Sequence, residues 1–185
     1  MASPQSIRIA GDPVLRARSE EVTDIDGELV ELTRTMFQTM YDAPGIGLAA
    51  PQVGIAQRFF VYDLGDDDGQ QVLLNPEITG GDGEWEFAEG CLSIPGQHFD
   101  VVRPKQIGVS GLDLHGNPVE FEADELLARL IQHELDHLDG VLVLDHLDDD
   151  QRREAKRLLR ELQMGLNTSE PAPEPRRPRS LFGFN

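Results

Sequence analysis

The chain has 185 residues, of which 39% are hydrophobic, a size and composition that suit one globular domain with a sizeable core and leave little chain for a second. The formal net charge is −18, and residues 1–150 hold 8 Lys and Arg against 30 Asp and Glu, which argues against a broad nucleic-acid surface because phosphate contacts need clustered positive charge. No apolar run approaches the length of a membrane span, and the single Cys91 excludes an intramolecular disulfide, so we expect a cytoplasmic protein with neither a membrane nor a disulfide partner.

The first part of the chain predicts a strand, a helix and a glycine-rich segment. Residues 7–9 are a short strand candidate. Residues 26–41 are expected to form a helix, since Asp26 lies in a capping region and apolar residues then recur at helical spacing. The following segment, residues 45–54, is small, apolar and punctuated by Gly, with Gln52 as its one amide side chain. Two interpretations remain open here: a pocket wall whose Gln52 hydrogen-bonds a ligand, or a buried turn in which the backbone satisfies Gln52.

Short strands separated by turns come next. Apolar runs predict strands over residues 59–63 and 72–78, with a turn at residues 80–83. Residues 106–114 and 119–122 alternate in part on either side of a turn. This pattern predicts a β-hairpin that leads into the next helix.

The strongest chemical signal is the stretch His133-Glu134-Leu135-Asp136-His137. We expect a helix over residues 123–139, because this stretch contains no Pro or Gly, begins with acidic residues and repeats Leu and Ile at helical period. Two His four apart then lie about 5–6 Å from each other on one helical face, so both can bind one metal ion. Glu134 lies between them and can reach a metal-bound water without being a ligand.

A catalytic metal usually has three protein ligands and one open position, so a third ligand is needed. Cys91 is a candidate, because a thiolate binds soft and borderline metals strongly. Two other interpretations of Cys91 stay open: a buried inert thiol, or a nucleophile paired with a His. A downstream acid such as Glu154 or Glu161 would instead complete a metalloprotease site. A non-catalytic metal-binding protein would have no need for Glu134.

The C-terminal part predicts a short strand over residues 141–144 and then an amphipathic helix over residues 148–164. The apolar residues of this helix, which should face inward, are Leu158, Leu159 and Leu162. Its Lys and Arg side chains should face outward. Residues 168–185 are rich in Pro and Arg and are expected to be a disordered tail, which leaves residues 1–167 as a single catalytic domain.

Three motifs resemble those of the peptide deformylase family, in the family's order and approximate spacing. They are Gly-Ile-Gly-Leu-Ala-Ala-Pro-Gln at residues 45–52, Glu-Gly-Cys-Leu-Ser at residues 89–93 and the pentad at residues 133–137. The likeness covers roughly residues 5–164. It implies an α+β fold with antiparallel β-sheets packed around a central helix that carries the metal motif, plus a C-terminal helix.

The resemblance also implies a hydrolase that removes the formyl group from the N-terminal formyl-methionine of nascent polypeptides and releases formate. Its metal is typically Fe²⁺, which Zn²⁺, Ni²⁺ or Co²⁺ can replace. The implied metal ligands are Cys91, His133 and His137. Glu134 would accept and return a proton, while the side-chain amide of Gln52 and the backbone N–H of Leu92 would stabilise the oxyanion.

Substrate binding follows from the same resemblance. The residues implied to line the methionine slot are Ile46, Gly47, Phe87, Leu126 and Leu130. An ion pair of Glu89 with Arg103 would support the site, and Arg129 departs from the family pattern by being polar where other members are apolar. The expected partners are N-formylmethionyl peptides, and the basic C-terminal helix and tail suggest a contact with ribosomal RNA, the alternative being a solvated helix face.

Overall fold

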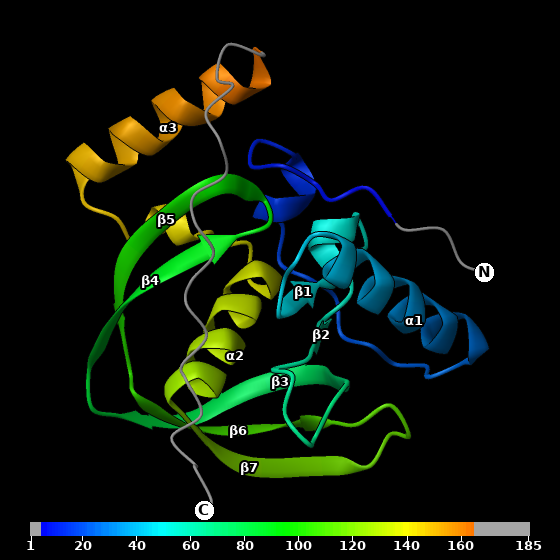
Figure 1. Cartoon of the computed structure of the whole chain (residues 1–185). Helices are drawn as coiled ribbons and strands as arrows, with labels where there is room; N and C mark the ends of the chain where they lie inside the picture. Colours follow the sequence, from blue (N-terminus) through cyan, green and yellow to red (C-terminus); the bar gives the residue numbers. More distant parts are fainter. Residues whose placement is uncertain (1–4, 165–185) are drawn as a thin grey trace, which may run out of the picture.

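The computed structural model describes residues 5–164, apart from the side chains of Leu162 and Gln163. It has an α+β fold in which antiparallel strands lie around one central helix, as the sequence predicts (Figure 1). The helices are α1 (Gly27–Asp42), α2 (Glu125–Leu138) and α3 (Asp149–Gln163), with short 3-10 helices η1 (Pro13–Arg16), η2 (Ala50–Val53) and η3 (Val143–Asp145). The strands are β1 (Gly47–Ala49), β2 (Phe59–Tyr62), β3 (Gln71–Asp82), β4 (Trp85–Cys91), β5 (Ile94–Arg103), β6 (Gln106–Leu112) and β7 (Pro118–Asp124).

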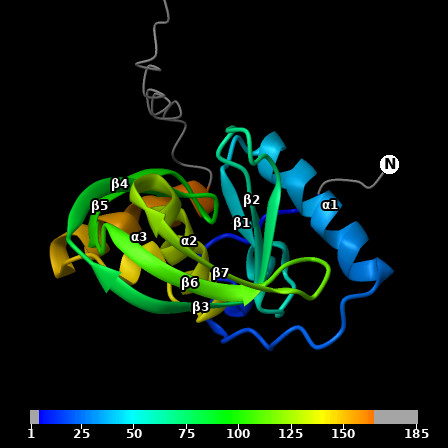
Figure 2. The same cartoon turned by 90° about the horizontal axis from the view of Figure 1, so that it is seen from below.

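The strands form two separate antiparallel sheets. One has five strands in the order β1-β2-β3-β6-β7, and the other is the β4–β5 hairpin. Figures 1 and 2 show α2 between the hairpin and the β3-β6-β7 part of the larger sheet, with β1 and β2 on the side of α1. The predicted hairpin is β6–β7, and it leads directly into α2. The helix that carries the His-Glu pentad is therefore covered from both sides.

Apolar side chains on α2 explain its central place. Ala128, Ile131 and Leu138 are fully buried against Phe60 and Val109 of the large sheet. Burying one such side chain contributes about 1.5–3 kcal/mol, so this face fixes which way the rest of the helix points. The opposite side of α2 is left to face the β4–β5 hairpin.

Helix α1 packs on the other part of the large sheet. Asp26 is its N-cap, and its side chain accepts hydrogen bonds from the backbone N–H groups of Glu28 and Leu29. Met36 and Met40 are fully buried in a cluster with the residues of β1 and β2. The prediction of a helix that begins next to Asp26 is confirmed.

The predicted strand over residues 7–9 is wrong. The segment from residue 5 to residue 20 is irregular apart from η1, because the left-handed Gly11 (φ 117°) and then Pro13 end any extended run at once. Its backbone instead donates single hydrogen bonds to other segments. Arg8 N–H donates to Gln52 O at 2.7 Å, Ala10 N–H to Ser93 O at 2.8 Å and Ser19 N–H to Leu138 O at 2.8 Å.

Two further expectations are corrected. Residues 143–145 form η3 rather than part of a strand, because Asp145 accepts a hydrogen bond from the backbone N–H of Leu142 and closes a tight turn. The apolar residues are buried all the same, in a cluster with α3. Strand β3 runs through residue 82, so only Gly83 (φ 67°) and Glu84 remain for the predicted turn.

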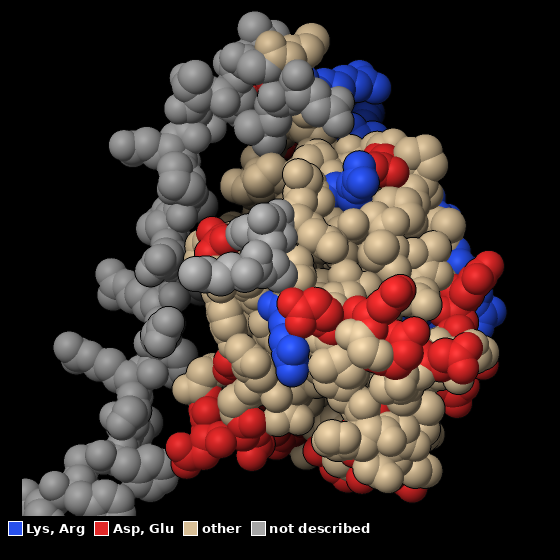
Figure 3. Space-filling view, turned by 90° about the vertical axis from the view of Figure 1, so that its right-hand side faces the viewer, with Lys and Arg blue, Asp and Glu red and all other residues tan. Residues whose placement is uncertain are grey.

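Helix α3 buries Leu159 and partly buries Leu158, while the side chain of Leu162 lies outside the described residues. The predicted tail over residues 168–185 also lies outside them. Within residues 5–164, no helix combines the length and the apolar character that crossing a membrane requires. The face seen in Figure 3 carries a band of acidic side chains with few Lys and Arg, in agreement with the acidic composition of the body.

Candidate metal centre and active site

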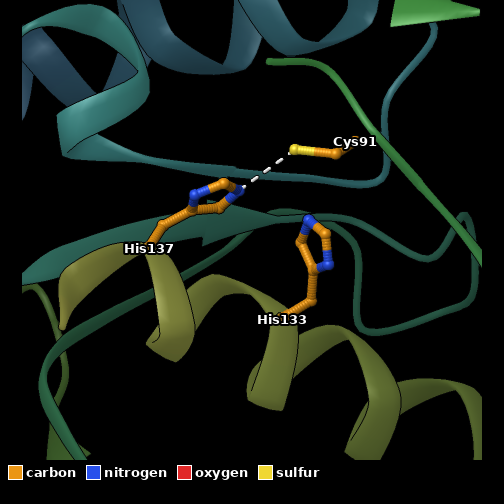
Figure 4. Close-up of side chains that lie close together, drawn as sticks. All are labelled: Cys91, His133 and His137. Carbon is orange, nitrogen blue, oxygen red and sulfur yellow. Dashed lines mark hydrogen bonds between the residues drawn. The ribbon is translucent and has the colours of Figure 1, made fainter. Parts of the chain in front are cut away.

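Helix α2 presents both His residues of the pentad to one side. The rings of His133 and His137 lie edge to face with centroids 5.0 Å apart (Figure 4). The helix ends at Leu138, and Gly140 follows with φ 73°. A Cβ at this glycine would lie 2.8 Å from the backbone of Arg16, so the chain can turn here only without a side chain.

Cys91 reaches the same place from the end of β4. Its sulfur lies 3.3 Å from Nε2 of His137, and one donor atom each from Cys91, His133 and His137 lies within 4.8 Å of the others. A tetrahedral ion with bonds of about 2.3 Å to sulfur and about 2.0 Å to nitrogen separates these two atoms by about 3.5 Å. The donors are thus spaced for one ion. This is the one cluster of at least three such donors that the structure forms within residues 5–164.

Glu89 orients His133. Its Oε2 lies 3.0 Å from Nδ1 of His133, and Arg103 donates two hydrogen bonds to the same carboxylate, at 2.6 and 3.0 Å. Burial raises the pKa of Glu89, but the hydrogen bonds from His133 and Arg103 outweigh it and hold that pKa far below its usual range. An ionised carboxylate can only accept, so Nδ1 of His133 donates to Glu89 and Nε2 is the nitrogen left for a metal. Burial lowers the pKa of His133, but hydrogen bonds with Cys91 and Glu89 outweigh it and raise that pKa well above its usual value, so metal binding at this ring displaces a proton. The predicted ion pair of Glu89 with Arg103 is present.

Burial also keeps His137 neutral. It lowers the pKa of His137 well below its usual value, and the nearby positive charges of His133 and Arg103 lower it further. A neutral imidazole is the form that binds a metal, so the environment of His137 favours ligation over protonation.

Glu134 lies beside the metal donors with one oxygen unpaired. Burial raises the pKa of its carboxyl group to about 7. Its Oε2 is buried and has no hydrogen-bond partner among residues 5–164, while Oε1 lies where a Cβ on Gly47 would approach to 2.4 Å. A carboxyl group that titrates near neutral pH is suited to accept and return a proton.

The contacts of Gln52 agree in part with each of the two interpretations of its segment, a buried turn and a pocket wall. Its Oε1 accepts a hydrogen bond from the backbone N–H of Ala49 at 2.9 Å, as expected for a buried turn. Its Nε2 donates to Oγ of Ser93 at 3.2 Å and lies 3.9 Å from the sulfur of Cys91, so the amide donor faces the metal donors. Leu92 follows Cys91 in the turn between β4 and β5.

Two of the residues implied for the methionine slot lie close to Glu134. Gly47 contacts Glu134, and Leu130 is buried one turn before it on α2. The exposed large hydrophobic side chains include Ile46, Phe87 and Leu126, at 43%, 39% and 38%. A hollow of about 500 Å³ on the large sheet, next to Asn75, Glu77 and Glu120, is lined by none of the predicted site residues.

Sequence reasoning missed how far the polar network extends. Arg103 also pairs with Asp136 at 2.8 Å, and His146 lies 2.7 Å from the same carboxylate. Arg129 makes a second ion pair with Glu89, at 2.7 Å. The signal in the sequence was that Arg129, one turn before His133, is polar where the resemblance implies an apolar residue.

The candidate acids for a metalloprotease site do not approach the His pair. Glu154 and Glu161 lie on α3, where both pair with Arg157 on the helix surface. Cys91 is the third donor beside the two His, so the structure does not favour that alternative.

Comparisons with known proteins agree with this site. The family described as polypeptide deformylase matches residues 4–153 of the chain. A peptide deformylase of Acidothermus cellulolyticus is 45% identical over 177 residues, which cover 95% of this chain and 97% of that protein. A peptide deformylase of Clostridium botulinum is 51% identical over 141 residues, which cover 76% and 95%.

A solved structure supports the same assignment. The crystal structure of a peptide deformylase from Legionella pneumophila matches with a TM-score of 0.85 and 41% identity, over 91% of this chain and 100% of that one. With a family match over most of its length and close relatives in sequence and in structure, this chain belongs to the polypeptide deformylase family of metal-dependent hydrolases.

Proposed function

We propose that this protein hydrolyses the formamide bond of N-terminal formyl-methionine on newly made polypeptides and releases formate. The observation that carries the proposal is the buried Glu134 beside three metal donors, Cys91, His133 and His137. A divalent metal bound there would polarise water and lower its pKa. A metal-binding protein without catalysis gains nothing from a buried carboxyl group with one unpaired oxygen, which costs stability.

The residues of the chain then have distinct tasks. Glu134 accepts a proton from the attacking water as the oxygen bonds to the formyl carbon. Negative charge develops on the formyl oxygen, and the N–H groups of the Gln52 side chain and the Leu92 backbone stabilise it. When the C–N bond breaks, Glu134 returns the proton to the leaving amine. The products are formate and a free N-terminus.

Selection of methionine is assigned to an apolar slot. We infer that its lining residues are Ile46, Gly47, Phe87, Leu126 and Leu130. A peptide side chain that covers the exposed members of this set removes apolar surface from water, at about 25 cal/mol per Å². We assign the whole reaction to a catalytic unit of residues 1–167, and we infer a cytoplasmic location because the substrate arises on translating ribosomes.

We propose Fe²⁺ as the metal, with Zn²⁺, Ni²⁺ or Co²⁺ able to replace it. One thiolate and two imidazoles form a donor set that suits borderline metals. Metal analysis of protein purified without oxygen should find about one Fe²⁺ per chain, and a stoichiometric hard metal such as Mg²⁺ in its place would contradict the assignment.

Formate release from formyl-Met-Ala-Ser tests the activity. Fe²⁺-loaded protein should release formate, Cys91→Ala should lose metal and activity together, and Glu134→Ala should keep metal but lose activity by about 100-fold or more. Absence of formate release from wild-type protein that holds stoichiometric metal would overturn the proposed function. Normal turnover by metal-loaded Glu134→Ala would overturn the role of Glu134 alone.

We also propose that the outer face of α3 contacts the ribosome. Lys156 and Arg160 are exposed there and make no ion pair with the described residues, so their charge is available to phosphate groups. Sedimentation with ribosomes should decrease as salt increases and should be lost in Lys156→Glu/Arg160→Glu. Binding that this double variant leaves unchanged would contradict the contact.

A further inference from the structure

Arg129 is a buried cation with no part in the proposed chemistry. It lies on α2 one turn before His133, and only 4% of it is exposed. A buried guanidinium group is costly unless its donors are paired. Nε of Arg129 has no hydrogen-bond partner among residues 5–164, so the contacts of its two terminal nitrogens indicate what it does.

Its partners all lie on the β4–β5 hairpin. One nitrogen donates to Oε1 of Glu89 at 2.7 Å and to the backbone O of Val101 at 2.8 Å. The other donates to the backbone O of Trp85, and the guanidinium carbon lies 5.2 Å from the centre of the Trp85 ring. One side chain of α2 thus holds both strands of the hairpin.

The hairpin needs such side-chain contacts. Within residues 5–164, β4 and β5 pair only with each other and share no ladder with the five-stranded sheet. Cys91 lies on the hairpin, whereas His133 and His137 lie on α2. The distance between the sulfur and the two imidazoles therefore depends on where the hairpin rests against α2.

The balance of charges around Glu89 also indicates that Arg129 supports the site. Glu89 and Asp136 provide two negative charges, and Arg103 and Arg129 provide two positive ones. Arg103 pairs with both carboxylates, whereas Arg129 pairs with Glu89 and not with Asp136. Loss of Arg129 would leave a buried carboxylate short of charge at the point where it orients His133.

We propose that Arg129 is a positioning residue that fixes the β4–β5 hairpin against α2 and so holds Cys91 at binding distance from the two His ligands. The contact between Arg129 and Trp85 also supports Phe87. The ring of Phe87 lies 4.7 Å from the ring of Trp85, and the guanidinium carbon of Arg129 lies over the Trp85 ring. This second effect rests on the proposed function, because it concerns the methionine slot. The effect on metal binding does not depend on which substrate is turned over.

The test compares two buried arginines on Co²⁺-loaded protein. Arg129→Met keeps the length of the side chain but removes its charge and donors. Arg58→Met is the matched control, because Arg58 is also buried and pairs with Asp139 at 2.6 Å, but it binds Pro76 O on the large sheet instead of the hairpin. Arg129→Lys keeps the charge without the fork of donors.

The first readout is the rate of Co²⁺ release to a chelator. It is monitored through the absorption of the complex between Co²⁺ and the thiolate. Arg129→Met should release Co²⁺ about 10- to 100-fold faster than wild type, as expected for loss of a group that supports a metal ligand. Arg58→Met should release it at the wild-type rate, and Arg129→Lys should fall in between. Hydrogen exchange over residues 85–103 should accelerate in Arg129→Met and, to a smaller extent, in Arg129→Lys, but not in Arg58→Met.

The proposal is overturned if folded Arg129→Met releases Co²⁺ at the wild-type rate, or if Arg58→Met accelerates release equally. If Arg129→Met does not fold, Arg129→Lys decides the question by the same two measurements, and wild-type values in both would reject the proposal. A failure of deformylation would leave the Co²⁺ experiment readable, so the two proposals can fail separately. With deformylation established, Arg129→Met should raise KM for formyl-Met peptides more than for formyl-Ala peptides.

Discussion

At the scale of single residues, Gly47 makes room for Glu134. An added Cβ would lie 2.4 Å from Oε1 of Glu134, far inside van der Waals contact. The neighbouring backbone of β1 is buried and paired with β2, so it has little freedom to move away. The carboxyl group would have to rotate out of place.

We therefore predict that Gly47→Ala lowers kcat/KM for formyl-Met-Ala-Ser by about 10-fold or more, because a small displacement of a proton-transfer group is costly. Metal content should stay the same, because Gly47 contributes no donor. The matched control is Gly80→Ala on β3, where an added Cβ meets nothing within 4 Å. Equal activity of the two variants would contradict this account of Gly47.

At the scale of secondary-structure elements, Asp26 decides where α1 begins. Its Oδ1 accepts hydrogen bonds from the N–H groups of Glu28 and Leu29, at 3.0 and 2.9 Å. Two otherwise unsatisfied donors of the first turn are thereby paired.

Asp26→Ala should lower the free energy of unfolding by about 1 kcal/mol in urea denaturation, with activity per folded molecule unchanged. The control is Asp24→Ala, because Asp24 is exposed and, among residues 5–164, its side chain accepts only from Oγ1 of its neighbour Thr23, at 3.4 Å. Identical midpoints for the two variants would show that the cap contributes no stability.

The elements also show how much the sequence could predict. Helix α2 and the β6–β7 hairpin were predicted because their periodicity runs over many residues and is bounded by clear turns. The strand predictions for residues 7–9 and 141–144 were wrong because a pattern of only three or four residues fits a strand and an irregular or tightly turned segment equally well. The apolar residues around Leu142 are buried against α3. Helix α3 lies outside the short stretch from which the strand was predicted.

The site, too, could be predicted from the sequence only in part. Donor chemistry made Cys91 a candidate third ligand beside His133 and His137, and the family resemblance singled it out from the alternatives; the structure brings the three together. The role of Arg129 could not be predicted, since its partners Trp85 and Glu89 lie about 40 residues away and reach it only through the packing of the hairpin on α2.

At the scale of the whole molecule, Glu134 links stability to pH. Its pKa is 4.5 in the unfolded reference and is raised by burial to about 7 in the metal-free fold. The native state thus holds the proton more tightly, so its contribution is fully present below pH 4.5 and is lost as pH rises through 7. The difference corresponds to about 3 kcal/mol.

We predict that metal-free wild type loses about 3 kcal/mol of stability relative to Glu134→Gln between pH 4.5 and pH 7.5 or so. Chemical denaturation of both proteins across this range measures the difference. The difference between the two proteins reports the carboxyl group of Glu134 together with its electrostatic coupling to His133. A constant difference between the two proteins would mean that Glu134 is not held in its protonated form.

The irregular N-terminal segment has a consequence for biosynthesis. Its backbone donors at residues 8, 10 and 19 find their acceptors 44, 83 and 119 residues further along the chain, on both glycine-containing motifs and at the end of α2. Contacts of such sequence separation close late, because the entropy of a long loop must be overcome first. A ribosome that makes this protein must therefore complete α2 before the N-terminal segment can make the last of these contacts, from Ser19 to Leu138. Each copy becomes able to process other nascent chains only after that stage of its own synthesis.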